Sequence, residues 1–242
     1  MAYTGSKYIE DDYLSISRGH IKGVTHIHKF GAVPAMSVNT TGSIWDVNDT
    51  LYPWSAFNTA GVLTIPPVNV ADNGNIITVF GLDENYNTIS ENFTTSSTLT
   101  VTGTKLFKRV YRAFDNVTTN AGNINIQKDG TTVARITAGK GQTLMSVYTV
   151  PAGYTGYLLK GTMSCQLSGD ATGDMFVRYF GQTSFRVGHS FEVSGAGGPY
   201  TYEFGVPIQI PAKSDIDVRA NVRTNNARVT AAFDLILIEG NR

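Results

Sequence analysis

Residues 147–159 read VYTVPAGYTGYLL and residues 204–220 read FGVPIQIPAKSDIDVRA, and these two stretches decide the fold class. Each consists of a run of strand-forming residues, a turn that begins with Pro-Ala, and a second run. Proline cannot donate a backbone hydrogen bond to a sheet, so each proline marks the end or the edge of a strand. Both stretches therefore predict two strands joined by a turn.

The same pattern extends over most of the chain. From His20 onward, short β-branched and aromatic runs recur about every 8–12 residues, and Asp129-Gly130 is a hairpin signal. We therefore expect an all-β protein with two β-sandwich domains, residues 20–117 and 118–242, the second of the jelly-roll type. Residues 1–19 are polar and aromatic without apolar periodicity, and we expect them to form an N-terminal arm that is ordered by a neighbouring subunit.

The composition restricts the classes of function. The chain has 242 residues, of which only 16% are charged, and 19 basic residues balance 19 acidic ones. A neutral chain of this kind argues against capture of nucleic acid and suits proteins that associate with one another. No apolar segment approaches the about 18 residues that predict a membrane span, and residues 1–8 lack the features of a signal peptide. We expect neither a nucleic-acid nor a membrane partner.

Cysteine and histidine give no strong metal signal. Cys165 is the only cysteine, which excludes a disulfide within the chain and fits assembly in a reducing cytoplasm; we interpret it as a small buried apolar residue. His26 and His28 lie two positions apart on an expected strand and face the same side, so they could chelate a metal with Asp46 or Asp49. A solvent-facing pair explains them without a ligand, and we predict no metal and no cofactor.

The acidic pairs are the remaining candidates for catalysis. Asp215 and Asp217 could serve a glycosidase, and Asp170 and Asp174 could do so or could hold calcium together with loop carbonyls. Asp215 lies in an expected turn and Asp217 on the strand after it, so we interpret both as solvated acids. With no nucleophile elbow and no phosphate-binding loop in the sequence, we expect no catalytic residues and no enzymatic activity.

Aromatic residues are the best candidates for contacts. Trp45, Tyr52 and Trp54 fall in a short polar segment, where they could stack on sugars or anchor an interface if exposed; burial in the first domain is the favoured interpretation. Neutral, Thr-rich strands predict self-association into a trimer or, as second choice, a dimer. The candidate anchors of that interface are Tyr154, Tyr157 and Tyr200.

Several segments together resemble a group of tailed-bacteriophage virion structural proteins. The resemblance covers most of the chain after Gly19 and is carried by turn and strand motifs. These are GVTHIHKFG at 23–31, IWD at 44–46, TVFGLDENYNTISE at 78–91, GNI at 122–124, VPAG at 150–153 and IPAKSDI at 210–216.

The resemblance implies a non-enzymatic structural component of a phage virion, assembled in the host cytoplasm. Within that group we expect a decoration or cement protein on the capsid head, with the major capsid protein or other virion proteins as partners. A tail or baseplate component is the near alternative. A carbohydrate-binding module that attaches to host glycans through Trp45 and Trp54 is a second class, and a polysaccharide hydrolase or lyase is a third.

Overall fold

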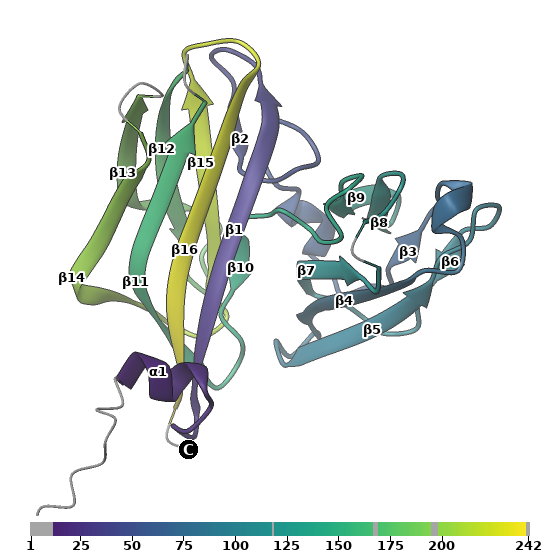
Figure 1. Cartoon of the computed structure of the whole chain (residues 1–242). Coiled ribbons are helices and arrows are strands. Elements are labelled where there is room, and N and C mark those ends of the chain that lie inside the picture. Colours follow the sequence, from purple (N-terminus) through teal and green to yellow (C-terminus); the bar gives the residue numbers. More distant parts are fainter. Residues whose placement is uncertain (1–11, 118, 167–168, 195–197, 241–242) are drawn as a thin grey trace, which may run out of the picture.

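The computed structural model describes residues 12–117, 119–166, 169–194 and 198–240, and their regular secondary structure is mostly strand (Figure 1). The helical elements of these residues are short: α1 (Asp12–Ser17), η1 (Trp54–Phe57) and η2 (Val70–Asp72). None of the described helices is long and apolar enough to cross a membrane. The expected all-β class is confirmed. The expected arm falls mostly on residues 1–11, which lie outside the described residues.

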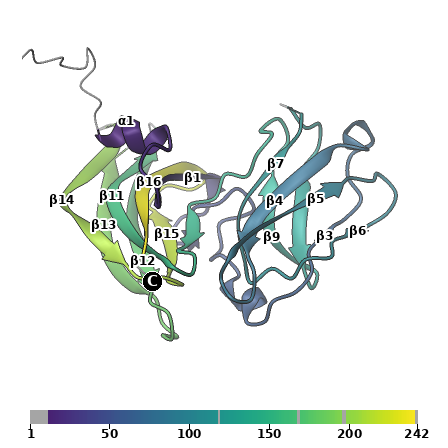
Figure 2. The same ribbon diagram turned by 90° about the horizontal axis from the view of Figure 1, so that it is seen from below.

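The larger group of strands consists of two antiparallel sheets that face each other (Figures 1 and 2). The first sheet has the order β1 (Val24–Met36), β16 (Ala227–Glu239), β11 (Tyr154–Cys165), β14 (Tyr200–Ile210). The second has the order β10 (Val147–Thr149), β15 (Asp215–Val222), β12 (Asp170–Arg178), β13 (Arg186–Ser194), and β2 (Thr41–Ser43) also pairs with β15.

One hydrophobic core lies between these two sheets. Successive side chains of a strand point to opposite faces, so alternate apolar positions of β16, such as Val229, Phe233 and Leu235, point into the core. Met175 of β12 and Val218 of β15 meet them from the second sheet.

The two Pro-Ala turns connect strands as predicted, but they connect different sheets. The first leads from β10 to β11 and the second from β14 to β15, so each carries the chain across the core. The turns lie side by side: Val150 N donates to Ser214 O (3.0 Å) and Lys213 N donates to Val150 O (2.8 Å). Gly153 and Lys213, at the third position of each turn, both have left-handed backbones, with φ of 80° and 64°.

The smaller group of strands has its own core. Its sheets have the orders β6 (Val101–Thr102), β3 (Thr64–Ile65), β8 (Ile124–Lys128), β9 (Thr131–Ile136) and β5 (Thr88–Thr94), β4 (Ile76–Leu82), β7 (Arg109–Asp115). The predicted hairpin joins β8 to β9, with positive φ at Asp129 (49°) and Gly130 (77°), as a tight turn of this kind requires.

Strand pairing groups the chain differently from the expected division at residues 117 and 118. β1 and β2 precede the smaller group in sequence, but β1 pairs with β16 and β2 pairs with β15 of the larger group. The smaller group is thus inserted between β2 and β10 (Figure 1). Local patterns could not reveal this, because His26 and its partner Ile236 are some 210 residues apart in the sequence.

Candidate functional site

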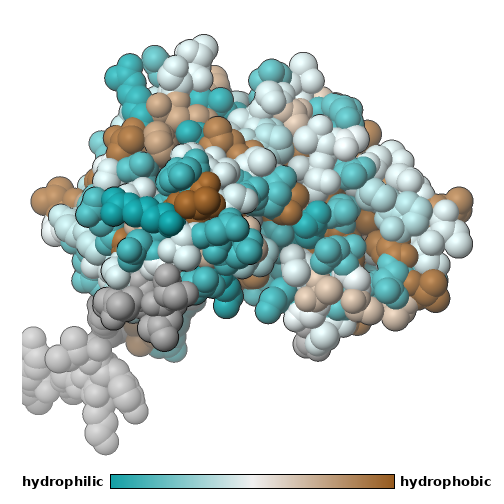
Figure 3. Space-filling view, turned by 90° about the horizontal axis from the view of Figure 1, so that it is seen from above, coloured by the Kyte–Doolittle hydropathy of each residue, from teal (hydrophilic) through white to brown (hydrophobic). Residues whose placement is uncertain are grey.

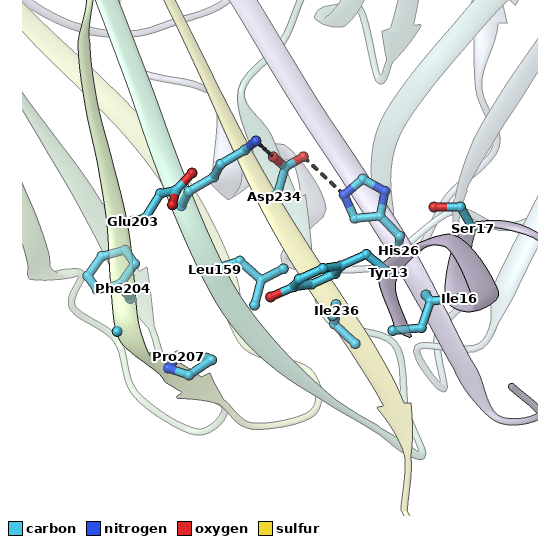
Figure 4. A pocket seen from close by; sticks show the side chains of 12 residues that line it. Tyr13, Ile16, Ser17, His26, Leu159, Glu203, Phe204, Pro207, Asp234 and Ile236 are labelled. Carbon is cyan, nitrogen blue, oxygen red and sulfur yellow. Dashed lines mark hydrogen bonds and ion pairs between the residues drawn. The ribbon is translucent and has the colours of Figure 1, made fainter. Parts of the chain in front are cut away.

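A hollow of 430 Å³ lies on the outer face of the first sheet, beside helix α1 (Figure 4). Four strands and the helix contribute to its wall, so it exists only once the sheet has formed. Its lining residues are Tyr13, Ile16, Ser17, His26, Leu159, Lys160, Glu203, Phe204, Gly205, Pro207, Asp234 and Ile236. Apolar side chains form one side of this hollow and charged side chains the other, which suits contact with a protein surface.

A bulge between β11 and β14 shapes this hollow. Leu158 pairs with Ile208 and Lys160 pairs with Glu203, so residues 204–207 of β14 stand opposite Leu159 alone. Extra residues in an edge strand bend it and redirect its side chains. The displaced segment carries Val206, which is 84% exposed, at the rim of the hollow.

Asp234 is the centre of the charged side of the hollow. Its Oδ1 lies 3.0 Å from His26 Nε2 and 2.6 Å from His28 Nδ1, and its Oδ2 lies 3.2 Å from Lys160 Nζ. Sheet register explains the cluster, because His28 and Lys160 are its direct neighbours on the two flanking strands. Burial by itself would raise the pKa of Asp234, but the hydrogen bonds from His28 and Lys160 outweigh it, and the pKa is lowered.

The variant Asp234→Asn should be less stable than the wild type by about 2 kcal/mol at neutral pH, since it loses charge-assisted hydrogen bonds. The folded-state pKa of Asp234 is depressed, so its contribution is present above the unfolded pKa and is lost as the pH falls through the folded value. Urea unfolding of both proteins at pH 7 and pH 3 measures this. A difference that stays constant between the two pH values would contradict it.

Apolar residues on the face seen in Figure 3 are dispersed. Seen from above, hydrophobic residues lie in small groups separated by hydrophilic ones over both groups of strands (Figure 3). The exposed Val206, in contrast, has apolar neighbours on the same strand. Phe204 and Pro207 line the hollow, and Tyr202 is 40% exposed. Together these residues make β14 a candidate contact edge.

The structure places neither of the candidate third metal ligands, Asp46 and Asp49, between the two histidines. His26 and His28 do face the same side, but the carboxylate between them is that of Asp234. Asp46 is buried in the smaller group, where it accepts a hydrogen bond from Thr137 Oγ1 (2.8 Å), and Asp49 accepts one from Ser37 N (3.1 Å). Among the described residues, no group of three or more His, Cys, Asp or Glu side chains is arranged to hold a metal ion.

The candidate aromatic contacts of the first half are core residues. Trp45, Tyr52 and Trp54 are 2%, 3% and 8% exposed. The ring of Tyr52 packs edge to face against both tryptophans, with ring centroids 5.2 Å from Trp45 and 4.7 Å from Trp54. Trp54 Nε1 donates to Asp217 Oδ2 (3.0 Å), which links the smaller group to the larger. Side chains this deeply buried cannot stack on a glycan from solvent.

Tyr154, Tyr157 and Tyr200 are half-buried, and the structure does not gather them into one patch. Tyr154 and Tyr200 pack against the large core. Tyr200 stands opposite Met163, whereas Tyr157 stands opposite Gln209, nearer the other end of β11. Their role as anchors of an oligomer stays a prediction.

The acidic pairs also differ from expectation. Asp215 and Asp217 are 2% and 0% exposed, so the interpretation as solvated acids is wrong; both lie in β15 and pair with arginines. Asp170 and Asp174 lie within β12, whose backbone pairs with β13 and β15 on its two sides. Asp174 accepts a hydrogen bond from Ser190 Oγ (2.6 Å). The calcium hypothesis needed a loop with free carbonyls, and this segment is a strand.

Two important carboxylates were not recognised as such from the sequence. Asp234 was missed altogether, although a signal existed: it interrupts the apolar run AAFDLILI at residues 231–238. A charge in such a run predicts an outward-facing or paired position. Asp215 was considered, but its partners Arg109 and Arg178 carry no sequence signal, because they come from distant strands.

No protein-family model and no curated protein matches the chain. Among solved structures, it is similar to a chain of "Structure of infectious bursal disease virus Gx strain", with 12% identity and a TM-score of 0.28 over 90% of this chain and 72% of that one. It is also similar to "Crystal structure of infectious bursal disease virus VP2 subviral particle", with 11% identity and a TM-score of 0.21 over 96% of this chain and 74% of that one. Similarity at this level carries no argument about function.

Proposed function

We propose that this chain is a non-enzymatic structural component of a virion, and specifically a decoration protein on the head of a tailed bacteriophage. The observation that carries the proposal is the strand order of the larger group. From β11 to β16 the chain crosses repeatedly between two facing sheets, with β11, β14 and β16 in one and the hairpin partners β12 and β13, together with β15, in the other. This order resembles that of a double-sheet jelly roll, an architecture used by viral capsid domains, and it supports the proposal.

Two further observations favour a structural role over the alternatives. The motifs behind the resemblance to phage virion proteins, VPAG at 150–153 and IPAKSDI at 210–216, form the two turns that cross between the sheets. The residues that would bind a glycan or act in a glycosidase have structural roles instead. Trp45 and Trp54 are core residues, and Asp215 is neutralised by arginines.

The outer face of the first sheet is the proposed assembly surface. An apolar side chain exposed to 84%, Val206, stands beside a hollow that could receive a matching side chain from a partner. Helix α1, which lies within residues 1–19 of the expected arm, lines the same hollow (Figure 4). We propose the major capsid protein as the partner there, and a closed trimer, or else a dimer, as the form in which the protein binds.

Replacing Val206 with lysine tests this surface. A charge at the centre of a contact should reduce incorporation into particles at least about tenfold, while an exposed site leaves the free energy of unfolding unchanged within about 0.5 kcal/mol. Val70→Lys is the matched control, because Val70 is 80% exposed on the smaller group. The measurement is the number of copies per virion, by quantitative mass spectrometry.

The wild-type copy number tests the function itself. A head decoration protein occupies repeated shell positions and should be present in hundreds of copies, whereas a tail or baseplate component is present in on the order of ten. Absence from purified virions would overturn the virion assignment. Equal incorporation of the Val206→Lys and Val70→Lys variants would instead overturn only the assembly surface.

A further inference from the structure

A second hollow, of 170 Å³, lies where the smaller group of strands meets the larger one. Its charged lining is unbalanced: four cations, Lys108, Arg109, Arg178 and Lys213, surround one carboxylate, that of Asp215. Neither the virion role nor the assembly surface uses this hollow. An excess of positive charge in a partly enclosed space attracts anions.

Asp215 holds the two arginines in place. Arg109 donates to both of its oxygens, through Nε to Oδ1 (2.8 Å) and through Nη2 to Oδ2 (3.0 Å). Arg178 donates twice to Oδ2, through Nε (3.0 Å) and Nη2 (2.6 Å), and Thr149 Oγ1 donates to Oδ1 (2.6 Å). Because the carboxylate already accepts from five donors, it has little capacity to accept further hydrogen bonds. Its single negative charge balances one of the two arginines, so one positive charge of the pair remains uncompensated.

Several hydrogen-bond donors in the hollow stay unused. In the part of the chain that the structure describes, no group accepts a hydrogen bond from Arg178 Nη1 or from Lys213 Nζ. Among the described residues, Lys108 Nζ donates only to Asn58 O (2.7 Å), which leaves two of its three protons without a hydrogen-bond acceptor there. Burial and the neighbouring Arg109 lower the pKa of Lys108, as expected where positive charges crowd together.

Aromatic rings connect these cations. Arg109 lies over Trp54 and Tyr86, with Cζ 5.5 Å from each ring centroid, and Arg178 lies 5.4 Å from the Trp54 ring. Lys213 Nζ is 5.7 Å from the Tyr86 ring. Trp54 and Tyr86 are 8% and 9% exposed, so their rings replace water on one side of the cations, which strengthens an electrostatic contact with a ligand.

The backbone at Lys213 gives an independent indication that its side chain is used. The two crossing turns read Pro-Ala-Gly153 and Pro-Ala-Lys213, and both third residues have a left-handed backbone. Glycine adopts this conformation without a steric penalty, whereas lysine, which has a Cβ atom, is strained in it. Tyr86, in the same hollow, is also left-handed (φ 66°). Bulky residues in this conformation concentrate at functional sites.

We propose that this hollow is an oxyanion-binding site that takes a single carboxylate or phosphate group. Guanidinium and ammonium donors match the oxygens of such groups. The hollow is smaller than the about 300–1,000 Å³ of pockets for drug-sized ligands, so it accommodates one anionic group. Lys213 and Lys108 close on the anion from the solvent side, and the arginines, fixed by Asp215, supply the field from within.

Thermal unfolding of the full chain tests the site, with inorganic phosphate and acetate as probes and chloride at equal ionic strength as reference. The wild type should show a rise in Tm that grows with phosphate or acetate concentration. Lys213→Gly should weaken the apparent anion affinity at least about tenfold, the equivalent of one charge-assisted contact. Its Tm without the anion should be unchanged or higher, because glycine removes the backbone strain. This combination separates a lost site from a damaged fold.

Lys140→Gln is the matched control, because Lys140 is an exposed lysine outside the hollow; its anion response should equal that of the wild type. The proposal is overturned if the wild type melts at one temperature in all three salts, or if Lys213→Gly keeps the full response. Light scattering then identifies the source of the anion. If it is a carboxylate of a second copy, phosphate and Lys213→Gly both reduce self-association; if it is a free anion, association does not change.

Discussion

Replacing Asp215 with alanine is expected to lower the free energy of unfolding by about 3–5 kcal/mol, the cost of removing one partner from a buried ion pair. Asp215 is 2% exposed and is hydrogen bonded to Arg109, which is 6% exposed, and to Arg178. Without the carboxylate, two guanidinium ions face each other across the junction of the two groups of strands. Urea unfolding at neutral pH measures the loss.

Asp170→Ala is the control for this experiment. Asp170 lies on β12, like Arg178, but is exposed, so its removal should change the unfolding free energy by no more than about 0.5 kcal/mol. Equal stability of the Asp215→Ala and Asp170→Ala variants would show that the ion-pair network does not hold the junction together.

Replacing Lys29 with methionine is expected to stabilise the protein. Lys29 of β1 is 7% exposed, donates a hydrogen bond to Tyr111 O of β7, and has a pKa lowered to about 7 by burial and by the nearby Arg112. A shift of that size from 10.5 corresponds to about 5 kcal/mol. The variant leaves the Tyr111 carbonyl without its hydrogen bond, which costs about 1–3 kcal/mol of this gain. We therefore expect the free energy of unfolding of the variant to exceed that of the wild type by about 2–4 kcal/mol at pH 6.

The gain should depend on pH with a defined sign. Below pH 7 Lys29 is protonated in both states and the folded state bears the full penalty of a buried charge. Between about pH 7 and 10.5 the unfolded chain binds more protons than the folded one, so wild-type stability rises with pH and the advantage of the variant shrinks. Guanidinium unfolding at pH 6 and pH 9 checks this, with the exposed Lys22→Met as control. A gain that is the same at both pH values would refute the buried charge.

Much of the fold was predictable because the signals are local. Proline fixes its own backbone and cannot donate, so Pro151 and Pro211 marked the strand ends that the structure shows. Asp129-Gly130 predicted the hairpin between β8 and β9, since few residue pairs adopt two consecutive positive φ angles. For the candidate site, the alternation of side chains along a strand placed His26 and His28 on one face.

The features that could not be predicted depend on contacts between residues that are remote in the sequence. The sequence alone determined an all-β chain, the ends of many strands and the face shared by the two histidines. Only the tertiary structure decided that β1 joins β16, that the Pro-Ala turns cross between sheets, and that Asp234 and Asp215 meet their cations. The physical reason is that strand period and turn chemistry are properties of a few consecutive residues. The choice of a partner strand, its register and the burial of a charge are set by the packing of the whole chain.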